Sequence, residues 1–288
     1  MAKLSSPSEI KRILETHGFH FSKALGQNFL IDDSVCPRMA EFCGAENVKG
    51  VLEIGPGIGV LTKELALRSE KVCAVELDKR LLPVLAETLS AFENVKIIQG
   101  DVLKLNLQDL IDKEFDGGPI SVCANLPYYI TSPIIMYLLE GKLPIHTITV
   151  MVQKEAAQRI CAEPGTRECG AVSASVHYHC EPEILFPVSR GCFMPPPNVD
   201  SAVIQLNVLK TPPIKVENEK FFFQLVHAAF LQRRKTAANS ISANLWVSKA
   251  DVENALQLAE LPINVRAEKL TLQNFAKLSN LLWQGGIR

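Results

Sequence analysis

Asn125, Leu126, Pro127 and Tyr128 lie where an apolar run, ISVCAN, gives way to a helix-start pattern, ITSPIIMYLL. An exocyclic adenine amine is a poor nucleophile until hydrogen-bond acceptors hold its two protons and draw the nitrogen toward tetrahedral geometry. The Asn125 side-chain oxygen and the Leu126 carbonyl are suitable acceptors, because Pro127 fixes its own φ and biases Leu126 to extended backbone. The tetrad therefore predicts alkylation of an aromatic amino group stacked on Tyr128. An ordinary strand-to-helix turn is the alternative, since Asn and Pro are common turn residues.

A glycine turn, Gly55-Pro-Gly57-Ile-Gly59, follows the strand-like run VLEI and precedes the helix-like VLTKELALR. Such a turn lets the backbone approach a ligand closely and presents unpaired N–H groups to it. A dinucleotide fingerprint needs its last glycine at Val60, so the pattern here is E-x-G-x-G-x-G instead. Nicotinamide or flavin is accordingly the minor interpretation.

Two carboxylates end the next two strand-like runs. Glu76 is placed to accept both hydroxyls of a ribose, and Asp101 to meet an adenine amino group. Either could instead cap a helix, and Asp78 in particular has the position of an N-cap. Their occurrence at successive strand ends favours a ligand, because open α/β sheets bind ligands at that edge. A nucleoside cofactor with free ribose hydroxyls and no pyrophosphate fits S-adenosylmethionine best.

The elements that must position these residues alternate along the first 150 residues. Short β-branched runs at 51–54, 72–76, 95–101, 120–125 and 147–152 are separated by amphipathic, helix-like segments. Near-continuous apolar strands between helices predict an α/β fold with a mainly parallel, doubly wound sheet.

The pattern changes after Gln153. Helix-like QKEAAQRICA and GAVSASVHYH are followed by two further strands, EILFPV and SAVIQLNVL, with a stiff FMPPPNVD loop between them. TPP at 211–213 breaks the chain, and the residues after it have helical period. We expect a catalytic domain at 1–208 and a small α-helical domain at 215–288.

Composition predicts a soluble, unexported, cytoplasmic protein. The 288 residues are 47% hydrophobic, and no apolar stretch approaches the roughly 20 residues that span a bilayer. The eight cysteines include no C-x-x-C pair, which favours reduced thiols over disulfides. The cluster Cys169, His177, His179 and Cys180 fits no common zinc finger, so we expect no metal.

The net charge of −1 is unevenly distributed. From Ser201 onward the chain has 11 Lys+Arg and 6 Asp+Glu, a net charge of +5, whereas the first 200 residues carry −6. A basic C-terminal part suggests contact with a polyanion. Arg233, Arg234 and Lys235 follow the apolar face of FFFQLVHAAFL, where a charge run is usually a solvated helix end.

Eight segments, in order, resemble the bacterial ribosomal RNA adenine dimethyltransferases of the small-subunit (16S) type. They span nearly the whole chain: LGQNFLID (25–32), VLEIGPGIGVLT (51–62), VELD (75–78), QGDVL (99–103), NLPYYITSPII (125–135), VMVQKEAAQRI (150–160), FMPPPNVDSAVIQL (193–206) and FLQRRKTAANSI (230–241). The resemblance implies a Rossmann-like methyltransferase fold. It also implies transfer of methyl groups from S-adenosylmethionine to N6 of two adjacent adenosines in the 3′-terminal hairpin loop of 16S rRNA, with a role in small-subunit biogenesis.

The resemblance also implies residue roles. The GQNFL segment would fold over the cofactor, with Asn28 and Leu30 touching it. The other residues that bind the cofactor would be Gly55, Gly57, Glu76, Asp101 and Asn125. The tetrad would hold the target adenine, with Phe193 as a second stacking surface, while Arg233, Arg234 and Lys235 would contact RNA. We expect a monomer.

Three rival hypotheses remain at this point. One is methylation of 23S rRNA of the large subunit, conferring macrolide resistance. Another is a non-catalytic ribosome-assembly or nucleic-acid-binding factor that kept the fold. The intact tetrad and glycine loop disfavour this hypothesis. The third, a dehydrogenase, is disfavoured by Val60.

Overall fold

The protein was analysed as a computed structural model that describes residues 3–19 and 28–286. In these two stretches no helix is both long and apolar enough to cross a membrane.

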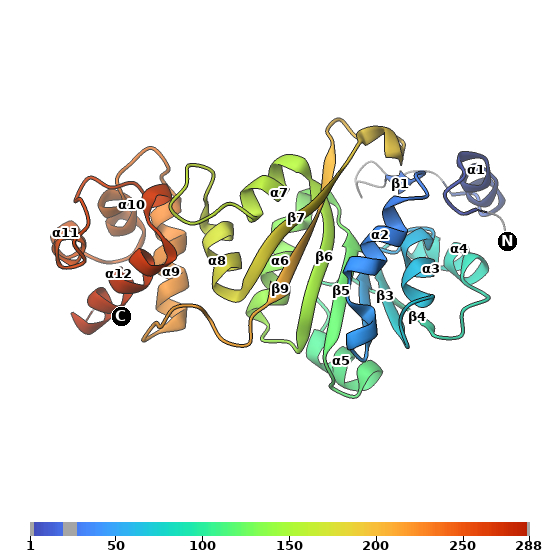
Figure 1. Ribbon diagram of the computed structural model, residues 1–288, viewed down its shortest axis with the longest axis horizontal. Helices are drawn as coiled ribbons and strands as arrows, with labels where there is room; N and C mark the ends of the chain where they lie inside the picture. The colour runs from blue at the N-terminus through green and yellow to red at the C-terminus, as the bar shows by residue number, and fades with distance from the viewer. Residues whose placement is uncertain (1–2, 20–27, 287–288) are drawn as a thin grey trace. The chain divides into compact units, whose positions relative to one another are not determined.

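A seven-stranded sheet forms the centre of the N-terminal part of the chain (Figure 1). Its strand order is β4-β3-β2-β5-β6-β9-β7. The strands span β2 Gly50–Ile54, β3 Val72–Glu76, β4 Val95–Gln99, β5 Ile120–Asn125, β6 Ile145–Gln153, β7 Cys180–Val188 and β9 Ser201–Val208. Strands β2 to β6 pair in parallel, and β9 is antiparallel to β6. The predicted mainly parallel α/β fold is confirmed.

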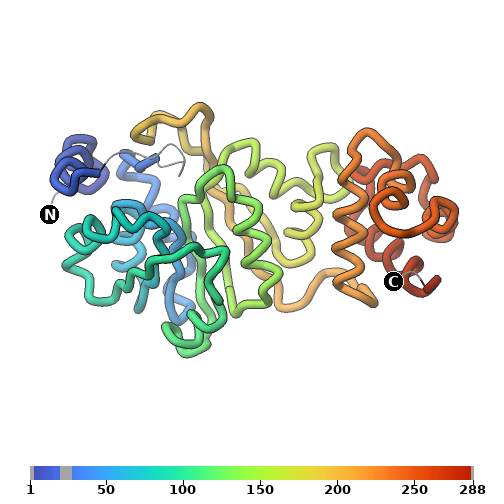
Figure 2. The backbone as a smooth tube through the Cα atoms, turned by 180° about the vertical axis from the view of Figure 1, so that it is seen from behind, coloured from blue at the N-terminus to red at the C-terminus, as the bar shows by residue number. Residues whose placement is uncertain are grey.

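Helices cover the sheet, which explains its continuous apolar strands. All residues of β2 and β3 are buried. Helices α2 and α3 pack on one face, seen in front of the sheet in Figure 1, and α6 lies on the face turned to the viewer in Figure 2. The α-helices before β7 are α1 Pro7–Thr16, α2 Val35–Phe42, α3 Val60–Ala66, α4 Leu82–Thr88, α5 Leu107–Phe115, α6 Thr131–Glu140, α7 Lys154–Ile160 and α8 Ala171–His179. Short 3₁₀ helices are η2 Ala45–Asn47, η3 Lys79–Leu81, η4 Tyr128–Ile130, η5 Arg190–Cys192 and η6 Ala267–Lys269.

Strand register brings the chemistry-bearing residues to one edge of the sheet. Ile54 pairs with Val75 and with Ala124, so the residues that follow each strand leave the sheet at the same level. Glu76 pairs with Gln99 at the end of β3 and β4. The carboxyl ends of parallel strands thus place the glycine loop, both carboxylates and Asn125 beside one another.

A separate two-stranded ribbon joins segments that are far apart in sequence. β1 Phe29–Leu30 pairs antiparallel with β8 Phe193–Met194, with Leu30 opposite Phe193. The Ile31 N–H donates to the Cys192 carbonyl at 2.8 Å, which extends this pairing.

The chain divides into two compact units. One comprises 1–157 and 183–208, and the other 158–182 and 209–288. The expected domain boundary at 208 coincides with this division, but 158–182 groups with the C-terminal unit and not with an unbroken 1–208. The reason is packing: Ala174 and Tyr178 of α8 lie in the same hydrophobic cluster as the C-terminal helices.

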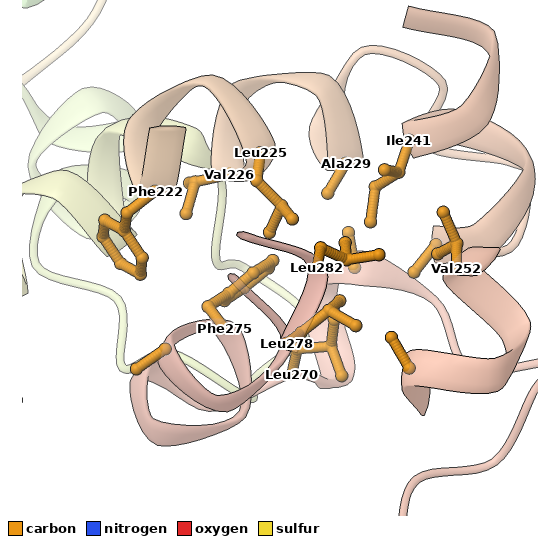
Figure 3. Packing of buried hydrophobic residues seen from close by; sticks show 14 of the residues in the cluster. Phe222, Leu225, Val226, Ala229, Ile241, Val252, Leu270, Phe275, Leu278 and Leu282 are labelled. Atoms are coloured by element: carbon orange, nitrogen blue, oxygen red, sulfur yellow. The ribbon is translucent and has the colours of Figure 1, made fainter. Parts of the chain in front are cut away.

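The C-terminal helices are α9 Glu219–Phe230, α10 Ala237–Asn244, α11 Lys249–Leu258 and α12 Leu272–Gln284. Their apolar faces form one cluster, in which Phe222, Leu225, Phe275 and Leu278 are completely buried (Figure 3). Side-chain caps at Asn218, Thr236, Ser248 and Thr271 accept backbone N–H groups and fix where each helix begins.

Candidate active site

The glycine loop between β2 and α3 has left-handed backbone at Gly55, Gly57 and Gly59, with φ of 71°, 61° and 90°. At Gly57 a Cβ atom would lie 3.1 Å from the Phe29 ring, so a larger residue would be both strained and crowded. Glycine therefore lets the backbone form a close-fitting wall of the pocket at this edge of the sheet.

Glu76 is bound to this loop. Its Oε2 accepts the Gly57 N–H at 3.3 Å and its Oε1 accepts the Asp78 N–H at 2.7 Å. Burial raises the pKa of the Glu76 carboxyl, while the Asp78 and Gly57 N–H groups oppose that shift. Each carboxylate oxygen keeps a further lone pair, so Glu76 can still accept hydroxyl groups. Asp78 caps η3 by accepting the Arg80 N–H, as its position in the sequence predicts.

Asp101 follows β4 and is held by its own turn. Its Oδ1 accepts the Leu103 N–H at 3.1 Å, and its Oδ2 lies 3.5 Å from Lys104 Nζ. Leu77, which follows Glu76, and Val102, which follows Asp101, line the same pocket. Two carboxylates with apolar neighbours are suited to a nucleoside, whose base is flat and whose edges are polar.

Glu53 is a buried carboxyl in the wall of the pocket. Only 1% of this residue is exposed, and its Oε2 has no hydrogen-bond partner among the described residues. Burial raises the pKa of Glu53 to about 8, and the nearby Glu76 carboxylate adds to the shift. At neutral pH the group is therefore largely protonated, and a positive charge placed in the pocket would favour its ionised form.

The tetrad begins at the last residue of β5. Asn125 pairs with Met151 of β6, and the Leu126 N–H donates to the Met151 carbonyl at 3.1 Å. Within 3–19 and 28–286, neither the Asn125 side chain nor the Leu126 carbonyl has a hydrogen-bond partner. The Pro127 carbonyl is occupied, because it accepts the Ile130 N–H at 3.2 Å. Two acceptors on neighbouring residues thus remain open.

Tyr128 is held by a contact from β9. Its hydroxyl hydrogen-bonds to Ser201 Oγ at 2.8 Å, and burial is the main cause that raises the pKa of this phenol. The ring is half-buried and lines the pocket. A tyrosine fixed at its hydroxyl presents its face in a constant orientation.

One pocket of the N-terminal unit is lined by every predicted catalytic and cofactor residue. These are Asn28, Leu30, Gly55, Gly57, Glu76, Asp101, Asn125, Leu126, Pro127, Tyr128 and Phe193. Asn28, Leu30 and Phe193 reach it through the β1–β8 ribbon. Phe193 is 2% exposed and also belongs to a hydrophobic cluster. The Gly26 and Gln27 part of the expected cofactor-covering segment lies outside the described residues.

The sequence analysis assigned no site role to several pocket residues, chiefly Glu53, Leu77, Val102 and Tyr129. For Glu53 a signal existed, since it opens the E-x-G-x-G-x-G pattern and is the one charged residue of the run VLEI. The sequence pattern favours a packing or surface role for Tyr129; this residue is 57% exposed and lines the pocket. Tyr137, for which the same role is expected, donates to the Leu105 carbonyl at 2.6 Å.

Arg233, Arg234 and Lys235 are not in this pocket. They lie in the turn between α9 and α10 of the C-terminal unit, where all three are exposed. Within the described ranges, no three His, Cys, Asp or Glu side chains gather as a metal would require.

A doubly wound sheet with a glycine loop and strand-end carboxylates at one pocket is typical of Rossmann-like enzymes that bind a nucleoside cofactor. Within that class, the family model described as ribosomal RNA adenine dimethylase matches residues 18–284. The chain belongs to this family, as the resemblance in its motifs predicted.

Relatives are similar over almost the full length. The ribosomal RNA small subunit methyltransferase A proteins of a Geobacillus species and of Bacillus pumilus are each 48% identical over 283 residues, covering 97% of both chains. Among solved structures, the 23S rRNA methyltransferase ErmE is 28% identical, with a TM-score of 0.68 over 89% of this chain and 100% of its own. A dimethyladenosine transferase from Plasmodium falciparum is 24% identical, with a TM-score of 0.70 over 90% of this chain and 99% of its own, and shows the fold.

Family membership decides between the methyltransferase and dehydrogenase hypotheses. The protein is an rRNA adenine methyltransferase, and the dehydrogenase hypothesis is excluded.

Proposed function

We propose that the protein transfers methyl groups from S-adenosylmethionine to N6 of two adjacent adenosines in the 3′-terminal hairpin loop of 16S rRNA, within the small ribosomal subunit. The observation that carries this proposal is the single pocket shared by the open Asn125 and Leu126 acceptors and the Glu76 and Asp101 carboxylates. The higher identity to small-subunit enzymes, 48% against 28% for the large-subunit enzyme ErmE, supports the choice of substrate.

The residues present suit the cofactor. When bound, S-adenosylmethionine supplies an already activated methyl group on a positively charged sulfur. Glu76 has lone pairs left for the two ribose hydroxyls, and Asp101 offers an acceptor for the adenine amine. Glu53, whose Oε2 lacks a partner in the described chain, is the carboxyl that a cationic ligand would ionise.

The target adenine must leave its stack to react, and aromatic faces compensate by roughly 1–3 kcal/mol per base. Tyr128, oriented by Ser201, supplies one face, and Phe193 the second. The Asn125 side-chain oxygen and the Leu126 carbonyl then accept hydrogen bonds from the two amine N–H groups, which returns the lone pair to the nitrogen. After the methyl group is transferred, the nitrogen releases one proton. Positioning and electrostatics do most of the work, so no strong general base is required.

Methylation of separated ribosomal subunits tests the proposal. Small subunits from cells lacking this protein should accept methyl groups, and mass spectrometry of their rRNA should detect dimethyladenosine near the 3′ end. Methylation of large subunits alone would overturn the choice of substrate. Binding of small subunits without any methylation would favour the assembly-factor hypothesis.

Arg233, Arg234 and Lys235 are proposed to contact RNA phosphates. Replacing all three with alanine should weaken binding to small subunits roughly tenfold to a hundredfold and reduce the salt slope by about 0.7–0.9 per lost phosphate contact. Filter binding across a salt series measures both quantities.

A matched control removes the same charge elsewhere. Lys210, Lys215 and Lys220 are also exposed in the C-terminal unit, and their triple alanine variant should keep the wild-type slope. Equal losses in the two variants would mean that net charge, and not a local contact, drives binding.

A further inference from the structure

Among the described residues of the C-terminal unit, Trp246 is the most exposed large apolar residue. Its side chain is fully exposed, in the connection between α10 and α11. The other tryptophan, Trp283, lies partly buried against Phe221, with ring centroids 5.5 Å apart. A tryptophan offers roughly 150–250 Å² for burial, so leaving one in solvent forgoes a large hydrophobic gain.

The backbone around Trp246 is fixed on both sides. Val247 is buried in the helical cluster and Leu245 packs against it. The Leu245 N–H donates to the Ile241 carbonyl at 2.8 Å, and Ser248 caps α11 by accepting the Asp251 N–H at 3.1 Å. The chain bends at Leu245 and Trp246, and the Val247 N–H donates to the Leu245 carbonyl across Trp246. Two apolar anchors therefore hold the connection while the indole projects outward.

The chain from the basic turn to Trp246 has no acidic residue. Residues 233–249 contain four Lys or Arg, namely Arg233, Arg234, Lys235 and Lys249, and no Asp or Glu. The first acidic residues beyond it are in α11, where Glu253 lies 3.4 Å from Lys249 Nζ. The basic turn at 233–235 precedes α10, and Trp246 follows its end. The eight residues of this helix span about 12 Å, roughly the length of three to four stacked nucleotides at about 3.4 Å each.

The face of α10 between these two points carries only small or polar exposed side chains. Asn239 and Ser242 are half-buried, and Ala243 and Asn244 are exposed. An exposed aromatic ring one helix length from a cationic turn is the combination that binds single-stranded nucleic acid, with phosphates on the cations and a base on the ring.

We propose that Trp246 is a base-stacking contact for an unpaired RNA nucleotide, on the same surface whose cationic end is the 233–235 turn. This inference rests on the proposed function, because rRNA is the polyanion that the protein would meet. Stacking accepts any base, so Trp246 contributes affinity and fixes the position of the RNA strand on the helical unit without reading its sequence.

Three variants test this proposal by binding to small subunits. Trp246→Ala should weaken binding about five- to a hundredfold, whereas Trp246→Phe should retain most of the affinity because it keeps a ring. The salt slope should stay at its wild-type value in both, since stacking releases no counterions. Leu258→Ala, which truncates another exposed apolar side chain of this unit, 59% exposed, is the control and should bind as the wild type does.

Fluorescence supplies a readout independent of affinity. In a Trp283→Phe background Trp246 is the only tryptophan of the chain. Its emission should be readily quenched by acrylamide in the free protein and become protected when protein-free 16S rRNA is added. Protection that instead depends on protein concentration without RNA would indicate self-association and overturn the proposal.

Failure of the inference differs from failure of the proposed function. If wild type methylates small subunits while Trp246→Ala binds them equally well, only the stacking contact is rejected. Wild type that neither binds nor methylates small subunits rejects both.

Discussion

Replacing Asn125 with alanine is expected to lower kcat for methyl transfer by about a hundredfold or more, with cofactor affinity changed by less than about tenfold. The Asn125 side chain has no hydrogen-bond partner among the described residues, so its oxygen is open to the target amine. Its interaction strengthens as the amine nitrogen becomes tetrahedral, so its loss raises the barrier more than it weakens ground-state binding. Single-turnover methylation of small subunits, with cofactor binding measured by calorimetry, separates the two effects.

Asn106→Ala is the matched control. Asn106 caps α5 by accepting the Gln108 and Asp109 N–H groups, and it does not line the pocket. Its loss should cost about 1 kcal/mol of stability but leave kcat unchanged. Near-wild-type turnover of the Asn125 variant would remove Asn125 from the proposed chemistry.

Glu53→Gln is expected to flatten the pH dependence of stability between about pH 4.5 and 8. The folded carboxyl has its pKa raised to about 8 by burial, whereas the unfolded chain ionises near 4.5. The folded state therefore holds more protons in this window, and its free energy of unfolding falls as pH rises from 4.5 to 8. The total loss is roughly 4–5 kcal/mol, since each pH unit between these values contributes about 1.4 kcal/mol.

Urea unfolding at pH 5 and pH 9, without cofactor, measures this difference. The Gln variant should lose much less stability between these values than the wild type. Glu114→Gln is an informative control, because Lys96 at 2.7 Å holds the pKa of Glu114 below its ordinary value and its window lies at more acidic pH. Identical pH profiles for wild type and Glu53→Gln would mean that Glu53 is not the titrating group.

Local pattern was sufficient to predict the elements of the methyltransferase fold. The apolar runs that end at Ile54, Glu76 and Asn125 end there in the structure as well. Once a parallel sheet is inferred, the carboxyl ends of these strands must share an edge, so the meeting of the glycine loop with Glu76 and Asn125 follows from topology alone.

Other parts of the site depend on contacts between segments that are far apart in the sequence, which the local hydrophobic pattern does not predict. The Tyr128 hydroxyl is fixed by Ser201, 73 residues later, and Leu30 meets Phe193 only because two two-residue strands pair. The assignment of 158–182 to the C-terminal unit has the same origin, since the helical pattern of α8 does not say which core buries it.

The sequence by itself determined the family, the order along the chain of the seven strands of the main sheet, and the residues of the tetrad and glycine loop, because these depend on residue type and short spacing. Tertiary structure decided that Glu53 is buried with an oxygen that lacks a partner among the described residues, that Ser201 holds the Tyr128 hydroxyl, and that Trp246 is exposed. Burial and long-range pairing set the environment of a side chain, and that environment fixes its pKa, its orientation and its access to a ligand.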